Sequence, residues 1–376
     1  MLARIGRAAG RALSLLLRGL LVLVVIEGTA SLVGFALAVA EGQRPPEKER
    51  LHMRYDPELG WAHVPDTRLE GFYGPGRHLT INAQGIRGKR VYAPQPPEGR
   101  LRAICAGDAF TLGTGVDDDD TWCALLERLE PRLETVNLGQ GGYGLDQAYL
   151  WVRRDGVAFD PDLLLFAFVR DDFGRMEKDT YHHYGKPVLR LGADRSLEIH
   201  NVPVPNTGER MPWLVRNAPL FEQLRIVRLA RPAIRALRPR AASRLTVGEL
   251  AELSAGVFEA LQRLSDQQAA TLVLLYLPTY DDYEQPGDVW RNRIGREARE
   301  RGIAFVDLVD EMRALPRSEV ANLYAPDDAF GPRSGEAPLS EAGNAWVAEA
   351  LRAHLRRLPE LAIALDDPSP EPGGRT

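Results

Sequence analysis

Short, mainly apolar runs recur from residue 101 onwards and are separated by longer amphipathic stretches. They cover residues 101–106, 135–138, 163–169, 271–277 and 303–308. Their length and their content of β-branched residues are typical of strands buried in a parallel sheet. The pattern therefore predicts five core strands that are joined by crossover connections.

The stretches between these runs carry apolar residues at helical spacing. The predicted helices cover residues 121–129, 247–264 and 289–301. Asp120 or Thr121 is the expected N-cap of the first helix, and Ser340 is expected to cap a final helix. This alternation predicts an α/β fold, a doubly wound parallel five-stranded sheet sandwiched by helices. Ligands of such sheets bind beyond the carboxyl ends of the strands.

A longer apolar run, residues 19–40, follows four arginines near the N-terminus. It is long enough to span a bilayer. The positive flank predicts a single-pass anchor in the inner (cytoplasmic) membrane, with the N-terminus inside and the main domain in the periplasm. The alternative is a signal peptide cleaved near Ala40, which would leave the main domain secreted. Glu27 inside the run marks either a partner in the membrane or an anchor that tolerates one charge.

The remaining segments are arranged around this fold. Residues 1–18 are expected to be cytoplasmic, 41–54 a linker, 55–100 a β-rich extension, 101–358 the main domain and 359–376 a disordered tail. The extension has too few apolar residues for its own core, so it is expected to cover one edge of the main domain. An insertion at about 181–246 contains a predicted hairpin at 187–204 and a basic stretch at 220–240. The basic stretch either contacts lipid headgroups or glycan, or is a solvated helix face.

Composition narrows the set of partners. The chain has a formal net charge of −5, and residues 1–50 are net basic, so the rest is more acidic still. Nucleic acid is not an expected partner, because phosphate binding needs a basic face. No Cys/His spacing typical of a metal site occurs, and we expect neither a metal nor a cofactor. Cys105 and Cys123 are either two packed thiols or a disulfide.

The first predicted strand runs into a glycine-rich loop, and residues 104–116 read ICAGDAFTLGTGV. This block resembles the Gly-Asp-Ser-x-x-x-Gly signature of the SGNH (GDSL-type) hydrolases. In that family the serine is the nucleophile of an ester hydrolase or acyltransferase. Gly107, Asp108, Thr111 and Gly113 match the family, whereas Ala109 stands at the serine position.

Further blocks extend the resemblance over roughly residues 101–355. Residues 137–144 resemble the loop that supplies a backbone N–H to the oxyanion hole, with Gly142 at the family's glycine position and Tyr143 beside it. Glycine there lets the backbone approach a ligand closely.

The third and fourth blocks depart from the family at the positions that carry chemistry. Asp171, between Arg170 and Asp172, replaces the asparagine of the Asn-Asp motif, and an ionised carboxylate repels a developing oxyanion. Gly335 and Pro338 occupy the aspartate and histidine positions of the Asp-x-x-His block before the last helix.

The resemblance therefore implies an SGNH fold without its catalytic set. Loss of the nucleophile or of the base alone costs on the order of 10⁶ in kcat. The expectation is a pseudoenzyme that binds a cell-envelope glycan, an acylated ligand or a protein partner. The pocket candidates are Asp108, Gly142, Tyr143, Arg170 and Asp172.

Two other interpretations stay open. The chain could be an active ester hydrolase or O-acyltransferase with relocated groups, for which His182 or His183 is the candidate base. Thr111 and Thr114 carry hydroxyls near the site, but both fit the turn chemistry of the loop. The chain could also be a purely structural envelope protein.

Overall fold

The computed structural model describes residues 14–22, 24, 25, 27–29, 31, 32, 51–181, 184–206, 245–284, 289–325 and 337–366. The chain divides into two units, residues 1–49 with 207–244, and residues 50–206 with 245–376. Outside the described residues lie parts of the expected anchor at 19–40, residues 41–50 of the linker and the basic stretch at 220–240. His182, His183, Gly335 and residues 367–376 also lie outside them.

The described residues between 14 and 32 are helical. A search of the described part of the chain finds no helix with the length and hydropathy needed to cross a bilayer.

The second unit contains the predicted sheet. Its five strands run in the order β13-β12-β7-β5-β6, and every neighbouring pair is parallel. They are β5 (Leu101–Gly107), β6 (Leu133–Gly139), β7 (Leu163–Phe168), β12 (Thr271–Tyr276) and β13 (Ala304–Asp307). The predicted doubly wound α/β fold is thus confirmed, because all five apolar runs form the strands expected of them.

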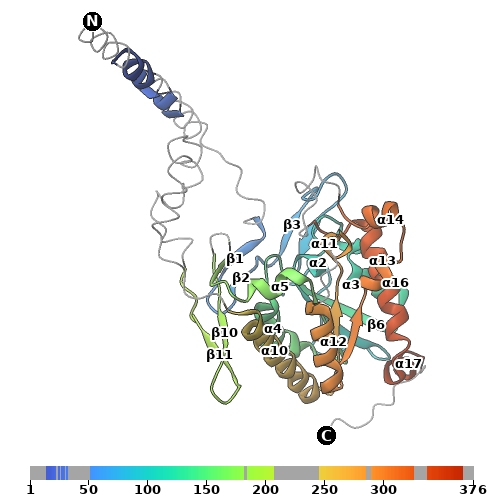
Figure 1. Cartoon of the computed structure of the whole chain (residues 1–376). Helices are drawn as coiled ribbons and strands as arrows, with labels where there is room; N and C mark the ends of the chain where they lie inside the picture. Colours follow the sequence, from blue (N-terminus) through green and yellow to red (C-terminus); the bar gives the residue numbers. More distant parts are fainter. Residues whose placement is uncertain are drawn as a thin grey trace, which may run out of the picture. The chain divides into compact units, whose positions relative to one another are not determined.

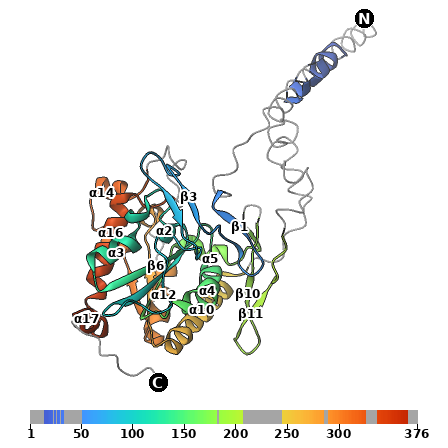
Figure 2. The same ribbon diagram turned by 180° about the vertical axis from the view of Figure 1, so that it is seen from behind.

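Helices cover both faces of this sheet (Figure 1 and Figure 2). On one face α10 (Val247–Gln267) packs against α4 (Leu145–Arg154), α12 (Val289–Arg301) and β12. On the other face α3 (Trp122–Leu129) packs against α16 (Glu341–Leu355) and β6. The shorter helices are α2 (Ala109–Leu112), η2 (Asp118–Asp120), η3 (Gly156–Phe159), α5 (Arg170–Arg175), α11 (Tyr280–Glu284), α13 (Val309–Arg313), α14 (Arg317–Asn322) and α17 (Pro359–Asp366).

Side-chain caps fix where the long helices begin. Thr121, one of the two predicted caps of α3, accepts a hydrogen bond from the N–H of Ala124. Ser340 accepts one from the N–H of Gly343 at the start of α16, as predicted. Each cap satisfies a backbone donor that would otherwise lack a partner in the first turn.

The β-rich extension lies at the β6 edge of the sheet. It contains two hairpins, β1 (Met53–Asp56) with β2 (Gly60–His63), and β3 (Thr67–Leu69) with β4 (Leu79–Ile81). Backbone bridges then join Ile81 to Arg87 and Arg87 to Asn137 of β6. Because the extension pairs with a core strand, it belongs to the main fold and is not an independent domain.

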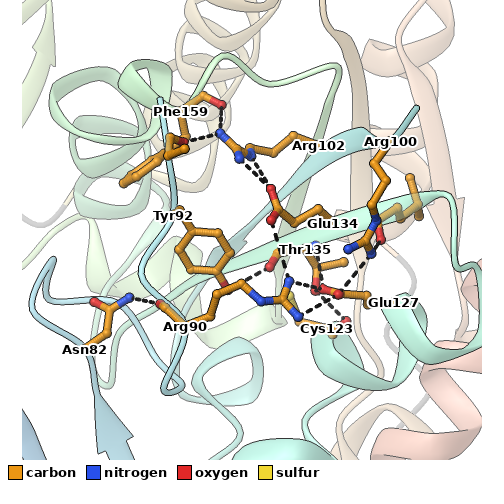
Figure 3. Close-up of polar contacts among 12 residues, drawn as sticks. Asn82, Arg90, Tyr92, Arg100, Arg102, Cys123, Glu127, Glu134, Thr135 and Phe159 are labelled. Carbon is orange, nitrogen blue, oxygen red and sulfur yellow. Dashed lines mark hydrogen bonds and ion pairs between the residues drawn. The ribbon is translucent and has the colours of Figure 1, made fainter. Parts of the chain in front are cut away.

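A buried arginine of β5 binds a glutamate of β6 (Figure 3) and also attaches the next stretch of the extension to the sheet. Arg102 of β5 is fully buried, and its Nε donates to a carboxylate oxygen of Glu134 on β6 at 2.8 Å. The same guanidinium donates to the backbone carbonyls of Ala93, Pro94 and Gln95. The charge is therefore paired, and its remaining donors hold the 93–95 segment in place.

The insertion and the C-terminal segment contain further ordered structure. The insertion holds β8 (Thr180–Tyr181), β9 (Tyr184–Gly185) and the predicted hairpin, formed by β10 (Val188–Leu191) and β11 (Leu197–His200). The expected disordered tail at 359–376 is wrong for its first part, because residues 359–366 form α17. Leu361 and Leu365 of α17 are buried in the main hydrophobic core, which supplies the stabilisation that the composition did not reveal.

The two cysteines form a disulfide. Cys105 on β5 and Cys123 on α3 have Cα atoms 6.3 Å apart, within the usual range for a bridge. Their sequence separation is 18 residues, and the enclosed loop contains the whole glycine-rich motif after β5. The alternative of two packed thiols is therefore excluded.

We expect the disulfide to stabilise the fold by about 3 kcal/mol, the loop-closure value for a loop of this length. The variant Cys105→Ala/Cys123→Ala should lose about that free energy of unfolding in urea titrations. Treatment with a reductant should destabilise the original chain but leave the variant unchanged. An equal response of both proteins to the reductant would contradict the bridge.

Two buried histidines, His52 just before β1 and His63 at the end of β2, share one hydrogen bond. The Nδ1 atoms of His52 and His63 lie 3.4 Å apart, and Nε2 of His63 lies 3.1 Å from the carbonyl oxygen of Gly139. Burial, and then the charges of the other histidine and Arg87, lower the pKa of His52 to about 3. Burial also lowers the pKa of His63 to about 4. Both rings are therefore neutral in the folded protein at neutral pH.

This pair should make folding sensitive to mild acid. In the unfolded chain both histidines have a pKa near 6.5, so below that pH the unfolded state binds more protons than the folded state. The free energy of unfolding should fall as the pH drops from about 7 towards 4, by up to about 1.4 kcal/mol per pH unit for each histidine. Denaturant titrations of the original chain and of His52→Gln/His63→Gln at pH 7 and 5.5 test this. Equal losses in both proteins would refute it.

Candidate functional site at the carboxyl ends of the strands

Three loops meet at the carboxyl ends of β5, β6 and β7, where the fold predicts a ligand site. Asp108 follows β5 and caps α2 by accepting the N–H of Phe110 at 2.9 Å. Close packing brings α2 onto the neighbouring strand, since a Cβ atom on Gly139 would lie 2.0 Å from the backbone nitrogen of Leu112. The glycine at the end of β6 is therefore required by the approach of two backbones.

The nucleophile position holds no hydroxyl. Ala109 is the first residue of α2 and is partly exposed. Thr111 is fully buried and its hydroxyl finds no hydrogen-bond partner among the described residues. The hydroxyl of Thr114 is hydrogen-bonded to Tyr73. Among the described residues neither hydroxyl is bonded to the backbone of the loop, in contrast to what the turn interpretation expects.

An arginine that the sequence motifs did not single out occupies the centre of this region. Nη1 of Arg175 donates to Oδ2 of Asp108 at 2.9 Å and to Oδ1 of Asp172 at 2.5 Å. It also donates to the carbonyl oxygen of Tyr143 at 3.2 Å. One guanidinium thus joins the loops that follow β5, β6 and β7, and brings together three of the predicted pocket residues.

The three charged groups of this cluster are largely withdrawn from solvent. The side chains of Asp108 and Asp172 are 2% and 3% exposed, and that of Arg175 is 12% exposed. Burial, and then the neighbouring Asp108 carboxylate, raise the pKa of Asp172. Burial alone would lower the pKa of Arg175, but the carboxylates of Asp172 and Asp108 outweigh it and raise the pKa. The guanidinium therefore stays charged and attracts both carboxyl groups, while their mutual repulsion favours the protonated form of Asp172.

A second buried ion pair, between Lys186 and Asp146, is hydrogen-bonded to the backbone of Arg175. Nζ of Lys186 lies 2.6 Å from Oδ2 of Asp146 and donates to the carbonyl oxygen of Arg175 at 2.8 Å. Burial lowers the pKa of Lys186, although Asp146 opposes that shift. The lysine is 1% exposed and bonded on two sides, so it fixes the backbone of Arg175.

Aromatic packing covers the loop that resembles the oxyanion loop. Gly142 has a φ of +79°, and a Cβ atom there would lie 2.2 Å from the ring of Tyr181. Tyr181 stacks on Trp61, whose ring also meets the ring of Tyr143 at 5.3 Å between centroids. The Tyr143 hydroxyl donates to the carbonyl oxygen of Trp61 at 2.5 Å. Gly142 and Tyr143 are thereby packed inside the protein.

Within the cluster Asp172 also has a structural role, because its Oδ2 accepts the N–H of Val169 at 2.9 Å. The remaining predicted site residues are placed differently. Asp171 is exposed and Arg170 partly exposed, so neither belongs to the buried cluster. Pro338 is buried, and its carbonyl accepts the N–H of Ala325 at 2.9 Å. Within the described segments no group of three His, Cys, Asp or Glu side chains is arranged to hold a metal ion.

Comparison with known proteins adds little to this geometry. No protein-family model and no curated protein matches the chain. A G-D-S-L family protein from Desulfitobacterium hafniense is 14% identical, with 68% of this chain and 99% of that one covered and a TM-score of 0.37. The lipase/acylhydrolase from Enterococcus faecalis is 9% identical, with 68% and 95% covered and a TM-score of 0.38. An acetyl xylan esterase is 14% identical, with 67% and 98% covered and a TM-score of 0.37. Values this low carry no argument about activity.

Removal of the Arg175 charge should destabilise the fold strongly, because it leaves two buried carboxylates without their cation. We expect Arg175→Met to lose about 3 to 5 kcal/mol in the free energy of unfolding. Adding Asp172→Asn should recover part of that loss. The exposed Lys178 offers a matched control, and Lys178→Met should change stability by less than about 0.5 kcal/mol. Similar effects of the two Met variants would contradict the role of Arg175.

Proposed function

We propose that the chain is an extracytoplasmic pseudoenzyme of the SGNH type, anchored in the inner membrane through residues 19–40. In this proposal it binds a cell-envelope glycan, an acylated ligand or a protein partner, and does not hydrolyse esters. The sequence blocks and the five-stranded parallel sheet support the family assignment.

The proposed loss of catalysis rests on which side chains occupy the site. A methyl group stands where the family has its nucleophile, at Ala109. Next to it, Arg175 binds the Asp108 and Asp172 side chains, while Tyr181 covers Gly142. Hydrolysis of an ester needs a nucleophile and free hydrogen-bond donors for the developing oxyanion. The side chains at these positions supply no nucleophile and are engaged in contacts with one another.

The disulfide supports placement outside the cytoplasm. Structural disulfides persist in oxidising compartments such as the periplasm and are rare in the cytosol of most organisms. Cys105 and Cys123 are both buried and joined, which fits a main domain that folds after export.

A hydrolase screen tests the proposal. The soluble domain should not turn over aryl acetates and should not be labelled by a fluorophosphonate that reacts with activated serines. The variant Ala109→Ser/Pro338→His restores two of the four family positions, and Ala109→Ser alone serves as its matched control. Turnover by the original chain, lost when His182 and His183 are replaced, would overturn the proposal and favour an active esterase or O-acyltransferase.

A further inference from the structure

A cavity lined by many charged residues lies beside β6, between the extension and α3. Its volume is about 740 Å³, and it is lined by residues of the 87–100 segment, of the stretch from η2 through α3, and of β6. Thr135 and Asn137 contribute the β6 wall. None of the residues in the Arg175 cluster lines it. The cavity is therefore separate from the site at the carboxyl ends of the strands.

The lining of this cavity is net positive, although the chain as a whole is net negative. Its cations are Arg87, Lys89, Arg90, Arg100 and Arg128, and its carboxylates are Asp118, Asp119 and Glu127. A concave surface with one predominant sign of charge raises the local concentration of the oppositely charged solute. The cavity thus favours an anion.

Two of the carboxylates are already bound by the protein itself. Asp118 pairs with Nε of Arg87 at 3.1 Å and also accepts the N–H of Thr80. Glu127 is shared by Arg90 at 2.8 Å and Arg100 at 3.0 Å (Figure 3). Arg90 also lies 3.8 Å from Glu134, which Arg102 binds in turn. Three guanidinium groups thus share two carboxylates, which leaves a positive excess at this wall.

These guanidinium groups are also held in place before any ligand arrives. The Arg90 guanidinium lies 5.7 Å from the centre of the Tyr92 ring. The Arg100 guanidinium is held by the Glu127 carboxylate at 3.0 Å. An oxyanion is the group that guanidinium donors bind best.

We propose that this cavity binds an oxyanion-bearing ligand, a carboxylate or a phosphate, and that Arg90, Arg100, Lys89 and Arg128 supply the charge. The inference rests on the proposed function in treating the chain as a binding protein, but it does not require the site at the strand ends to be inactive. Lys89 and Arg128 are exposed at the cavity wall and provide long-range attraction, while Arg90 and Arg100 provide directed donors.

Titration calorimetry with the full chain tests the proposal. The probes are inorganic phosphate, glucuronate and, as the uncharged control, glucose. We expect saturable binding of at least one anion, none of glucose, and weaker binding at higher salt. The two anions distinguish a phosphate ligand from a carboxylate ligand. Absence of saturable anion binding, or equal binding of glucose, would overturn the inference.

The exposed cations allow a test that spares the fold. Lys89→Gln/Arg128→Gln should weaken anion binding about tenfold, with the urea midpoint unchanged. Arg190→Gln removes an exposed charge from the distant hairpin and should leave binding unchanged. Equal weakening in the Arg190 variant would mean non-specific attraction and would contradict the site. Hydrolase turnover with intact anion binding would refute only the pseudoenzyme, whereas an inactive chain without anion binding would refute only this cavity.

Discussion

The arrangement at the carboxyl ends of the strands depends on one guanidinium group. Arg175 binds Asp108 and Asp172, which follow different strands, and also donates to the Tyr143 carbonyl after β6. Two buried carboxylates would repel each other without a cation between them, so the three loops keep their present positions only while that charge is present. Lys186 lies in the insertion, between β9 and β10, and donates to the Arg175 carbonyl. The position of this part of the insertion is therefore also tied to Arg175.

The fold could be predicted from the sequence because each core strand is an almost uninterrupted apolar run. A parallel strand that is buried on both faces is apolar at nearly every position and does not alternate apolar with polar residues. The strands β7 and β12 show this most clearly. The caps Thr121 and Ser340 were also predictable, since their hydroxyls act within three residues of chain. The C-terminal segment was not, because the burial of Leu361 and Leu365 depends on partners far away in sequence.

In the candidate site, too, features of single positions could be predicted from the sequence, and contacts between distant residues could not. The absence of a hydroxyl at Ala109 is a property of one position, so it is visible in the sequence. The role of Arg175 depends on contacts across 67 residues to Asp108, and no spacing rule announces it. An Asp three residues before an Arg, as at Asp172, is common on helix surfaces and does not distinguish a buried pair from a solvated one. The cavity beside β6 could not be predicted from the sequence either, since its cations come from separate segments that only the fold brings together.

The bridge between Arg87 and Asn137 has a consequence for how the domain can be isolated. Strand β6 ends the sheet on that side, and the extension supplies a backbone partner to it. An unpaired strand edge offers its N–H and C=O groups to any other chain and promotes aggregation. Truncation at residue 100 would expose that edge and leave Arg102 without the carbonyls of Ala93 and Pro94, so a shortened chain that keeps the edge covered must begin before Arg87. The extension therefore protects the β6 edge from pairing with another chain.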